Sequence, residues 1–184
     1  MPIENKQLSE KLSAYQQVLM NTTVFRKAWT VSVKEKIRNT LQDFIASSGL
    51  NARIIENTDM ENLESITMDL GRSSSGIAQS KETAEIRNFM IKNNGGLIYQ
   101  QLFNGKIMAM VNQPHIEGYG ERKEPQFVEI VTPDEINEVL VLEHVEIMLE
   151  ILTQWEDFDD EGPQKKTVFN PIGFQHSVNP DDAK

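Results

Sequence analysis

Residues 97–112 read LIYQQLFNGKIMAMVN, two apolar runs on either side of Asn104-Gly105. Asn-Gly is the preferred pair for a two-residue turn with positive φ at both positions, which predicts a β-hairpin of residues 97–103 and 106–112. Pairing of Phe103 with Lys106 fixes the predicted register. One face then carries Ile98, Gln100, Leu102, Ile107, Ala109 and Val111, and the other carries Leu97, Tyr99, Gln101, Phe103, Met108 and Met110. Both faces are largely apolar, which predicts a central hairpin covered on both sides.

Further strand patterns surround this hairpin. Residues 51–57, 63–70 and 126–131 are rich in β-branched and alternating apolar side chains, which predicts three more strands. We interpret the Ser/Gly-rich residues 71–80 as a loop. Residues 81–94 place Ile86, Phe89 and Met90 on one helical face before Gly95-Gly96, which predicts a short helix.

Two amphipathic stripes precede the strands. Apolar residues recur at helical spacing over 4–20, and a second stripe predicts one helix over 23–47 that is closed by Gly49. This second stripe consists of Phe25, Trp29, Val33, Ile37, Leu41 and Phe44. A capping-box pattern at Ser32 indicates an alternative, in which the helix begins at residue 33 and residues 24–31 are extended.

The clearest helix start is Thr132-Pro133-Asp134-Glu135, which combines an N-cap Thr, Pro at the first helical position and Glu at the third. The predicted helix runs to about residue 156. Four of its carboxylates, Glu135, Glu143, Glu146 and Glu150, fall within a sector of about 80°. The rest of its circumference is nearly all apolar, so we expect burial on two sides, by the sheet and by a neighbouring helix or a second subunit.

Together these patterns predict an α+β fold: an antiparallel sheet of about five strands with N-terminal helices and a long C-terminal helix packed on it. A strongly curved sheet that grips this helix around a ligand cavity is the architectural alternative. We expect an N-terminal helical arm (1–22), a single domain (23–157) and an acidic, polar tail (158–184).

Charge is segregated along the chain. Residues 124–164 hold thirteen carboxylates and no Lys or Arg, whereas the rest holds 18 basic and 15 acidic residues. Lys27, Lys34 and Arg38 share one side of the predicted 23–47 helix. Antiparallel packing of that helix on the last one would bring the two charge sets together; a solvated acidic face is the alternative.

Composition narrows the classes of function. There is no cysteine, which excludes disulfides and thiol chemistry, and a reducing cytoplasm fits this composition. The longest unbroken apolar run, 139–142, is too short to cross a bilayer. The net charge of −10 disfavours nucleic acid and anionic lipid as partners.

Candidate sites are few. His144 lies among apolar residues of the last helix, and we interpret it as a hydrogen-bonded core residue. Glu143, Glu146 and Glu150 could hold a cation, but acidic helix faces are common, so no metal or cofactor is expected. Segment 113–125 carries His115, Glu117, Tyr119 and Arg122, a possible acid/base or ligand-binding set; an ordinary polar turn is the alternative.

Segment 71–80 has the glycine spacing of a phosphate loop but lacks the Lys-Ser/Thr that such loops require. Arg72 and Ser74 could still hold a small anion there. In the tail, residues 168–174 gather four apolar side chains, including Phe169 and Phe174, in a polar surround. This segment is a possible docking motif, for its own domain or for a partner.

The first hypothesis is therefore a non-enzymatic, cytoplasmic interaction module. It self-associates, for example as a homodimer, through the last helix or the Tyr99/Met108/Met110 face, and its acidic face meets a basic partner. The alternative is a small-molecule- or anion-binding protein, or a hydrolase, with its site in segments 113–125 and 71–80. Nucleic-acid binding by the basic residues 26–38 is a weaker third hypothesis.

Overall fold

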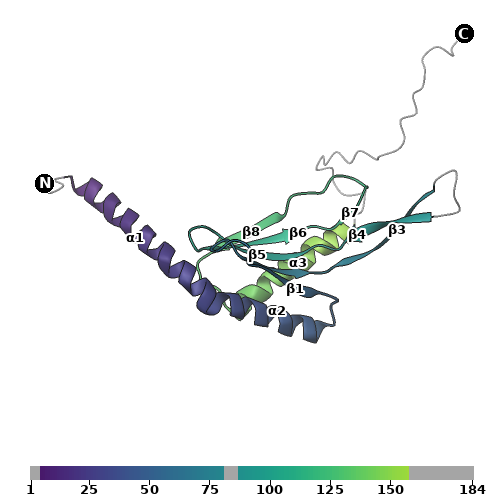
Figure 1. The fold of residues 1–184 in the computed structure, drawn as a ribbon, viewed down its shortest axis with the longest axis horizontal. Coiled ribbons are helices and arrows are strands. Elements are labelled where there is room, and N and C mark those ends of the chain that lie inside the picture. The colour runs from purple at the N-terminus through teal and green to yellow at the C-terminus, as the bar shows by residue number, and fades with distance from the viewer. Residues whose placement is uncertain (1–4, 81–86, 158–184) are drawn as a thin grey trace, which may run out of the picture.

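The computed structural model describes residues 5–80 and 87–157; the predicted tail lies outside them. Figure 1 shows the arrangement of the elements. In chain order they are α1 (Lys6–Ala28), the π-helical turn η1 (Trp29–Val33), α2 (Lys34–Ser48), β1 (Arg53–Asn57), β2 (Ser65–Asp69), β3 (Arg72–Ser80), β4 (Arg87–Asn93), β5 (Gly96–Gln101), β6 (Ile107–Asn112), β7 (His115–Ile116), β8 (Gln126–Val131) and α3 (Glu138–Glu156).

Five strands form one antiparallel sheet in the order β1-β2-β5-β6-β8, and β3, β4 and β7 form a second, smaller one. Chain bends at Gly71 and Gly95, both with positive φ, connect the two sheets. The β3–β4 ribbon therefore projects beyond the main sheet (Figure 1). The predicted α+β class is confirmed, with N-terminal helices, a five-stranded antiparallel sheet and a C-terminal helix packed on it.

The central hairpin forms, but its predicted register is wrong by one residue. Leu102 N–H donates to the Lys106 carbonyl, and Gly105 N–H donates to the Leu102 carbonyl, both at 2.8 Å. The loop therefore has three residues and places only Gly105 at positive φ, the geometry of a type I turn with a glycine bulge. The shift moves the whole of β6 to the other face relative to β5.

This register decides which residues form the core. The buried face of β5 and β6 carries Leu97, Tyr99, Gln101, Ile107, Ala109 and Val111. The opposite face carries Ile98, Met108 and Met110, which are half-buried. Tyr99 thus faces away from Met108 and Met110, so the face that was expected to combine them does not form.

Segments 71–80 and 81–94 were predicted as a loop and a helix, and both predictions are wrong. Residues 72–80 form β3 and residues 87–93 form β4, which pair in antiparallel register. Phe89 lies in β4 and pairs with Ala78, while Ile86 lies outside the described residues. Pairing between strands overrides a weak local helical pattern here, because strand preference depends strongly on context.

The N-terminal helices are continuous from residue 6 to residue 48, so residues 24–31 are helical. At η1, Lys34 N–H donates to the carbonyl of Trp29, five residues earlier. In a regular α-helix, residues spaced four apart drift steadily around the helix axis, and the wider π-turn offsets part of this drift. Trp29, Val33, Ile37 and Leu41 therefore all face the core. Gly49 closes α2 in the left-handed conformation, as predicted (φ 70°).

α3 begins five residues later than predicted. Thr132 and Glu135 do pair, because the Glu135 carboxylate accepts from Thr132 N–H at 2.6 Å and from its hydroxyl at 2.7 Å. They close a turn, however, and the helix itself is capped by Asn137, whose side chain accepts from Leu140 N–H at 3.0 Å. Between them, fully buried Ile136 anchors the turn to the core.

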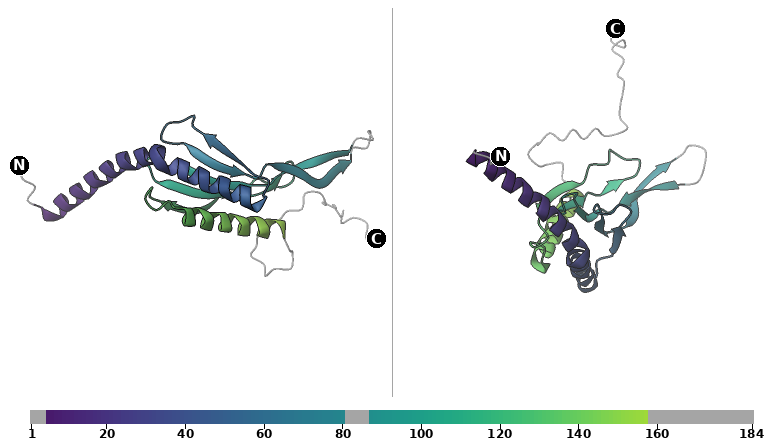
Figure 2. Two further views of the ribbon diagram at one scale, coloured as in Figure 1. Left: turned by 90° about the horizontal axis from the view of Figure 1, so that it is seen from below. Right: turned by 60° about the vertical axis from the view of Figure 1, so that its left-hand side comes forward.

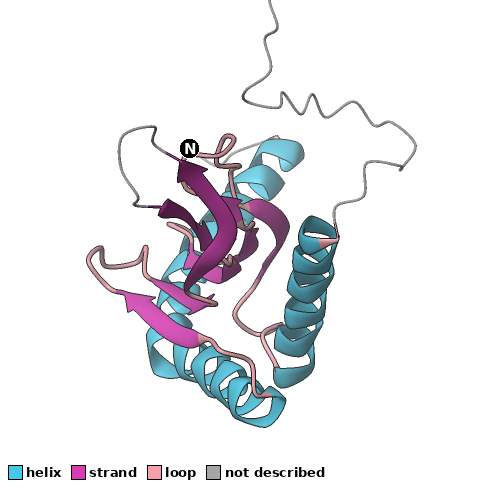
Figure 3. Cartoon of the chain, turned by 90° about the vertical axis from the view of Figure 1, so that its right-hand side faces the viewer, coloured by secondary structure: helices cyan, strands magenta, loops and turns pink. Residues whose placement is uncertain are grey.

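Both α2 and α3 lie on the same face of the main sheet (Figures 2 and 3). The core fills the space between them and the strands, with Trp29, Ile37, Leu97, Tyr99 and Met148 among its largest buried side chains. None of the described helices covers the opposite face of the sheet. The expected cover on both sides of the hairpin is therefore wrong for the described residues.

Candidate functional site

Helix α1 carries an apolar stripe with no cover in the described structure. Leu8, Leu12, Tyr15 and Leu19 are between 42% and 61% exposed, and none of the 23 residues of α1 is buried. Their 4-3-4 spacing places them within about 60° on a helical wheel, the pattern of a coiled-coil seam. Figures 1 and 2 show α1 leading away from the sheet toward the N-terminus.

The inner end of α1 is held by the turn between β5 and β6. The Arg26 guanidinium donates two hydrogen bonds to the Phe103 carbonyl, at 2.9 and 2.5 Å. Gly105 lies so close that a Cβ there would be 2.6 Å from the Arg26 nitrogen and 2.7 Å from Phe25 Cβ. This contact fixes the direction in which α1 leaves the domain.

The open face of the main sheet is a second unpartnered surface. Register places Ile55, Thr67, Ile98, Met110 and Phe127 in one row across all five strands. Phe127 is 57% exposed, and Met110 is half-buried. Thr67 interrupts the apolar row, so the row is weaker as a binding surface than the helical stripe.

The acidic face of α3 is exposed, as its wheel predicts. Glu143, Glu146 and Glu150 all point to solvent, and Val139 and Leu142 beside them are exposed as well. The second apolar side expected for this helix is therefore only partly buried within the described chain. Within the described residues, no Lys or Arg forms an ion pair with these three carboxylates.

The predicted pairing of these carboxylates with the basic helix is wrong. Lys34 binds Glu56 at 3.0 Å and Glu64 at 3.1 Å, and Arg38 binds Glu56 at 3.1 Å. Lys34 and Arg38 thus form ion pairs with carboxylates of β1 and of the β1–β2 connection, on the same side of the sheet. Since Arg26 and Lys36 also bind carbonyls, four of the five basic residues in 26–38 are engaged within the protein.

This ion-pair cluster shifts two pKa values. Burial alone would lower the pKa of Lys34, but hydrogen bonds and charge from Glu56 and Glu64 outweigh it and raise the pKa. Burial would likewise raise the pKa of Glu56, but Lys34 and Arg38 hold that pKa below its usual range. The cluster therefore favours the charged form of both partners.

A buried polar chain crosses the core. The Tyr99 hydroxyl lies 2.9 Å from His144 Nδ1, and His144 Nε2 lies 2.5 Å from a Glu129 carboxylate oxygen. In the tautomer with its proton on Nε2, the ring donates to the Glu129 carboxylate, and Nδ1 accepts from the Tyr99 hydroxyl. Burial, and secondarily the charge of Glu129, raises the pKa of Tyr99.

The interpretation of His144 as a hydrogen-bonded core residue is confirmed, since its side chain is almost fully buried. Its partner Glu129 was not singled out in the sequence. The sequence did contain a signal, because Glu129 interrupts an apolar strand. In the structure, this position pairs with core residue Ala109.

Several residues of the predicted ligand site do come together in the small sheet. Arg72, Asn93 and His115 are register neighbours across β3, β4 and β7, and Arg72 forms an ion pair with Glu117 at 3.5 Å. Ser74 is exposed on β3, and its hydroxyl accepts from Gly76 N–H at 3.4 Å. Tyr119 N–H bonds to the Ile116 carbonyl at 3.1 Å, and Arg122 is exposed.

This set does not form a cavity with obvious chemistry. The ion pair with Glu117 neutralises the charge of Arg72, which weakens Arg72 as an anion ligand. His115 Nδ1 is buried without a hydrogen-bond partner among the described atoms. Neither segment 71–80 nor segment 113–125 lines either of the two grooves on the domain surface.

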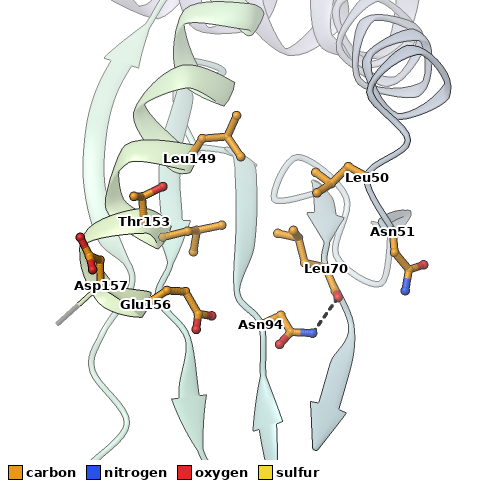
Figure 4. Close-up of a pocket in the computed structure, with 9 residues that line it drawn as sticks. Leu50, Asn51, Leu70, Asn94, Leu149, Thr153, Glu156 and Asp157 are labelled. Carbon is orange, nitrogen blue, oxygen red and sulfur yellow. Dashed lines mark hydrogen bonds between the residues drawn. The ribbon is translucent and has the colours of Figure 1, made fainter. Parts of the chain in front are cut away.

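The larger groove lies between the end of α3 and the connection from α2 to β1 (Figure 4). Its volume is about 590 Å³. Four leucines line it, with polar side chains beside them: Leu50, Leu70, Leu149 and Leu152, then Asn51, Asn94, Thr153, Glu156 and Asp157. A second groove, of about 400 Å³, lies between α2 and the start of α3 and is lined by polar residues, including Lys36, Asp43 and Asn137.

In the described part of the chain, no three His, Asp or Glu side chains gather in a way that could hold a metal ion. No helix within the described ranges is long and apolar enough to span a membrane. Comparison with protein-family models, with curated proteins and with solved structures finds no match to this chain.

Proposed function

We propose that this protein is a non-enzymatic interaction module that self-associates through α1 and offers the acidic face of α3 to a basic partner. The observation that carries the proposal is the exposed stripe Leu8, Leu12, Tyr15 and Leu19 on a helix that leaves the domain. Most helical stability in proteins comes from tertiary packing of an amphipathic face, and no residue of α1 is buried. A second copy of α1 packed on the stripe would supply the missing tertiary contacts.

The expected affinity is modest. Fully burying one large apolar side chain stabilises by roughly 1.5–3 kcal/mol. Eight half-exposed side chains at a two-fold interface would then supply a gross gain on the order of 10 kcal/mol, against an association cost of about 4–15 kcal/mol. Association should therefore depend on protein concentration in the micromolar range or above.

The test is sedimentation velocity of the full chain over a broad concentration series. We expect the weight-average mass to rise with concentration and to stay monomeric in the double variant Leu12→Glu/Leu19→Glu. The matched control is Met20→Glu/Val24→Glu, because Met20 (58% exposed) and Val24 (61%) lie outside the stripe on the same helix. A wild-type chain that stays monomeric throughout would refute self-association, and equal loss in the control would refute the stripe as its site.

The carboxylates Glu143, Glu146 and Glu150 support the second part of the proposal, since they are exposed and have no basic partner among the described residues. A lysine-rich amphipathic peptide should bind wild-type protein at low salt and bind the Glu143→Gln/Glu146→Gln/Glu150→Gln variant less. Binding that is equal in both proteins would contradict this part. The absence of cysteine supports a reducing compartment such as the cytoplasm.

The competing function, anion or small-molecule binding at segments 71–80 and 113–125, has less support. Arg72 is neutralised by Glu117, and neither groove is lined by these segments. Thermal shifts with a metabolite and metal panel test this alternative. Shifts that are abolished by Arg72→Ala or His115→Ala would favour it over self-association.

A further inference from the structure

The groove at the end of α3 is apolar at its base and open to solvent. Leu152 is nearly buried, Leu149 is 37% exposed, and Leu50 and Leu70 are half-buried. Figure 4 shows the side chains of Leu50, Leu70 and Leu149 directed into the space between α3 and the segment that follows α2. Asn94 Nδ2–H donates to the Leu70 carbonyl at 3.2 Å and holds the strand end on one side of the groove. The groove is thus a shaped apolar surface with a polar rim.

The chain itself leaves the described structure at the edge of this groove. Glu156 and Asp157, the last two described residues, line it, and 27 residues follow them. The apolar segment 168–174 begins eleven residues after Asp157. That length spans at most about 36–40 Å when extended and roughly 17–20 Å as a flexible chain. The segment therefore starts within reach of the leucines.

We propose that residues 168–174 of the same chain dock in this groove, with Phe169, Ile172 and Phe174 against the leucines. A cavity of about 590 Å³ is of the size that takes a compact apolar ligand, so it accommodates a few large side chains. Charge also matches: Lys165 and Lys166 precede the segment, and Asp157 stands on the rim beside Glu156, which already pairs with Lys92 at 2.6 Å. Gly162-Pro163 lies between them, a sequence that favours a reversal of the chain.

Tethering makes a weak contact sufficient. A segment joined by a short flexible linker experiences an effective concentration in the millimolar range. A few buried aromatic and aliphatic side chains can then keep the groove occupied most of the time. The inference concerns the opposite end of the molecule from α1, so it stands or falls independently of self-association.

The experiment uses the absence of cysteine in the natural chain. A nitroxide label on Asn170→Cys, in otherwise full-length protein, should broaden the NMR methyl signals of Leu50, Leu149 and Leu152. The methyl signals of Ile98 and Met110, on the open face of the sheet, serve as the internal reference. We expect the groove signals to lose at least about twofold more intensity than the reference, and Phe169→Ser/Phe174→Ser to abolish that difference.

The matched control is Val178→Ser, an apolar-to-polar change in the tail outside the docking segment. It should leave the broadening in place. Equal broadening of groove and reference signals, or broadening that survives Phe169→Ser/Phe174→Ser, would overturn the proposal. A mixture of labelled and isotope-enriched chains adds a second check, because broadening seen only between chains would assign the groove to another copy and likewise overturn docking within one chain.

Discussion

The Tyr99–His144–Glu129 chain connects β5, α3 and β8 through a single imidazole. Tyr99→Phe keeps the ring but removes the hydroxyl that bonds to His144 Nδ1 at 2.9 Å, and no other described residue is bonded to this buried nitrogen. We expect a loss of about 1–3 kcal/mol in the free energy of unfolding, measured by urea denaturation. Tyr15→Phe, on exposed α1, is the control and should change the unfolding free energy little. Equal effects of the two substitutions would show that the hydroxyl contact does not contribute.

The Lys34–Glu56 cluster predicts a pH dependence. The pKa of Glu56 is below its ordinary value of 4.5 in the folded state, so its ion pairs stabilise fully above that pH and are lost as pH falls through the folded pKa. The raised pKa of Lys34 gives stabilisation that is lost only when pH rises above 10.5. Below pH 4.5, wild-type protein should therefore lose unfolding free energy more steeply than Glu56→Gln.

The control for this titration is Glu143→Gln, whose carboxylate is exposed on α3. Its acid profile should differ from that of wild-type protein by no more than the roughly 0.2–0.5 kcal/mol of the repulsion between Glu143 and Glu146. Chemical denaturation at a series of pH values between neutral and acid measures all three proteins. Parallel profiles for Glu56→Gln and wild type would show that Glu56 is not a source of the acid sensitivity.

The junction of α1 with the β5–β6 turn depends on one glycine. Gly105→Ala would place a Cβ against the backbone of Phe25 and Arg26 and would strain a residue with φ of 78°. We expect a destabilisation well above 1 kcal/mol, measured as a lowered thermal midpoint. Gly118→Ala is the matched control, since it has the same φ of 78° but nothing within 4 Å of the added Cβ. A similar fall in both variants would attribute the effect to backbone strain alone.

Elements with strong local signals were predictable, whereas elements defined by distant contacts were not. Asn104-Gly105 predicted the hairpin correctly. The same pair, however, fits a two-residue or a three-residue loop, and the loop length decides which face of the sheet each residue of β6 occupies. Strand β3 is Ser-rich, so its own residues favour a loop, and it is stabilised as a strand by its pairing with β4. Of the site, His144 and the acidic wheel of α3 were predictable. The exposure of the stripe on α1 was not predictable, because an apolar stripe indicates that a helix needs a partner but does not indicate which element covers it.

The main sheet is covered by helices on one face, and α1 leaves it at one end (Figure 1). The larger groove lies at the end of α3. Among the described residues, apolar surface thus remains uncovered on α1, on the open sheet face and in the groove. A net charge of −10 opposes nonspecific clustering of these surfaces, because it repels like molecules at low salt. The proposed self-association therefore requires a defined seam, the stripe on α1, and not nonspecific apolar contact.

Five of the thirteen carboxylates of residues 124–164 lie on α3, which carries no Lys or Arg, so their repulsion should cost stability. Glu146 has like-charged neighbours three residues before and four residues after it on the same helix, and each such pair destabilises by about 0.2–0.5 kcal/mol. Glu146→Lys turns both pairs into attractive ones, so we expect a gain of roughly 0.8–2 kcal/mol in the free energy of unfolding at low salt. Urea denaturation measures the gain, and it should shrink toward zero near 1 M salt, where the screening length is about 3 Å.

The control substitution is Glu138→Lys, in the first turn of the same helix. An acidic residue is favourable at a helix N-terminus, so this charge reversal should destabilise while it changes the net charge by the same amount. If both reversals stabilised equally, the benefit would come from lower net charge and not from the α3 face. If Glu146→Lys stabilises and also weakens the lysine-rich peptide, the acidic face is kept for binding at the expense of stability, which is the relation that a partner surface requires.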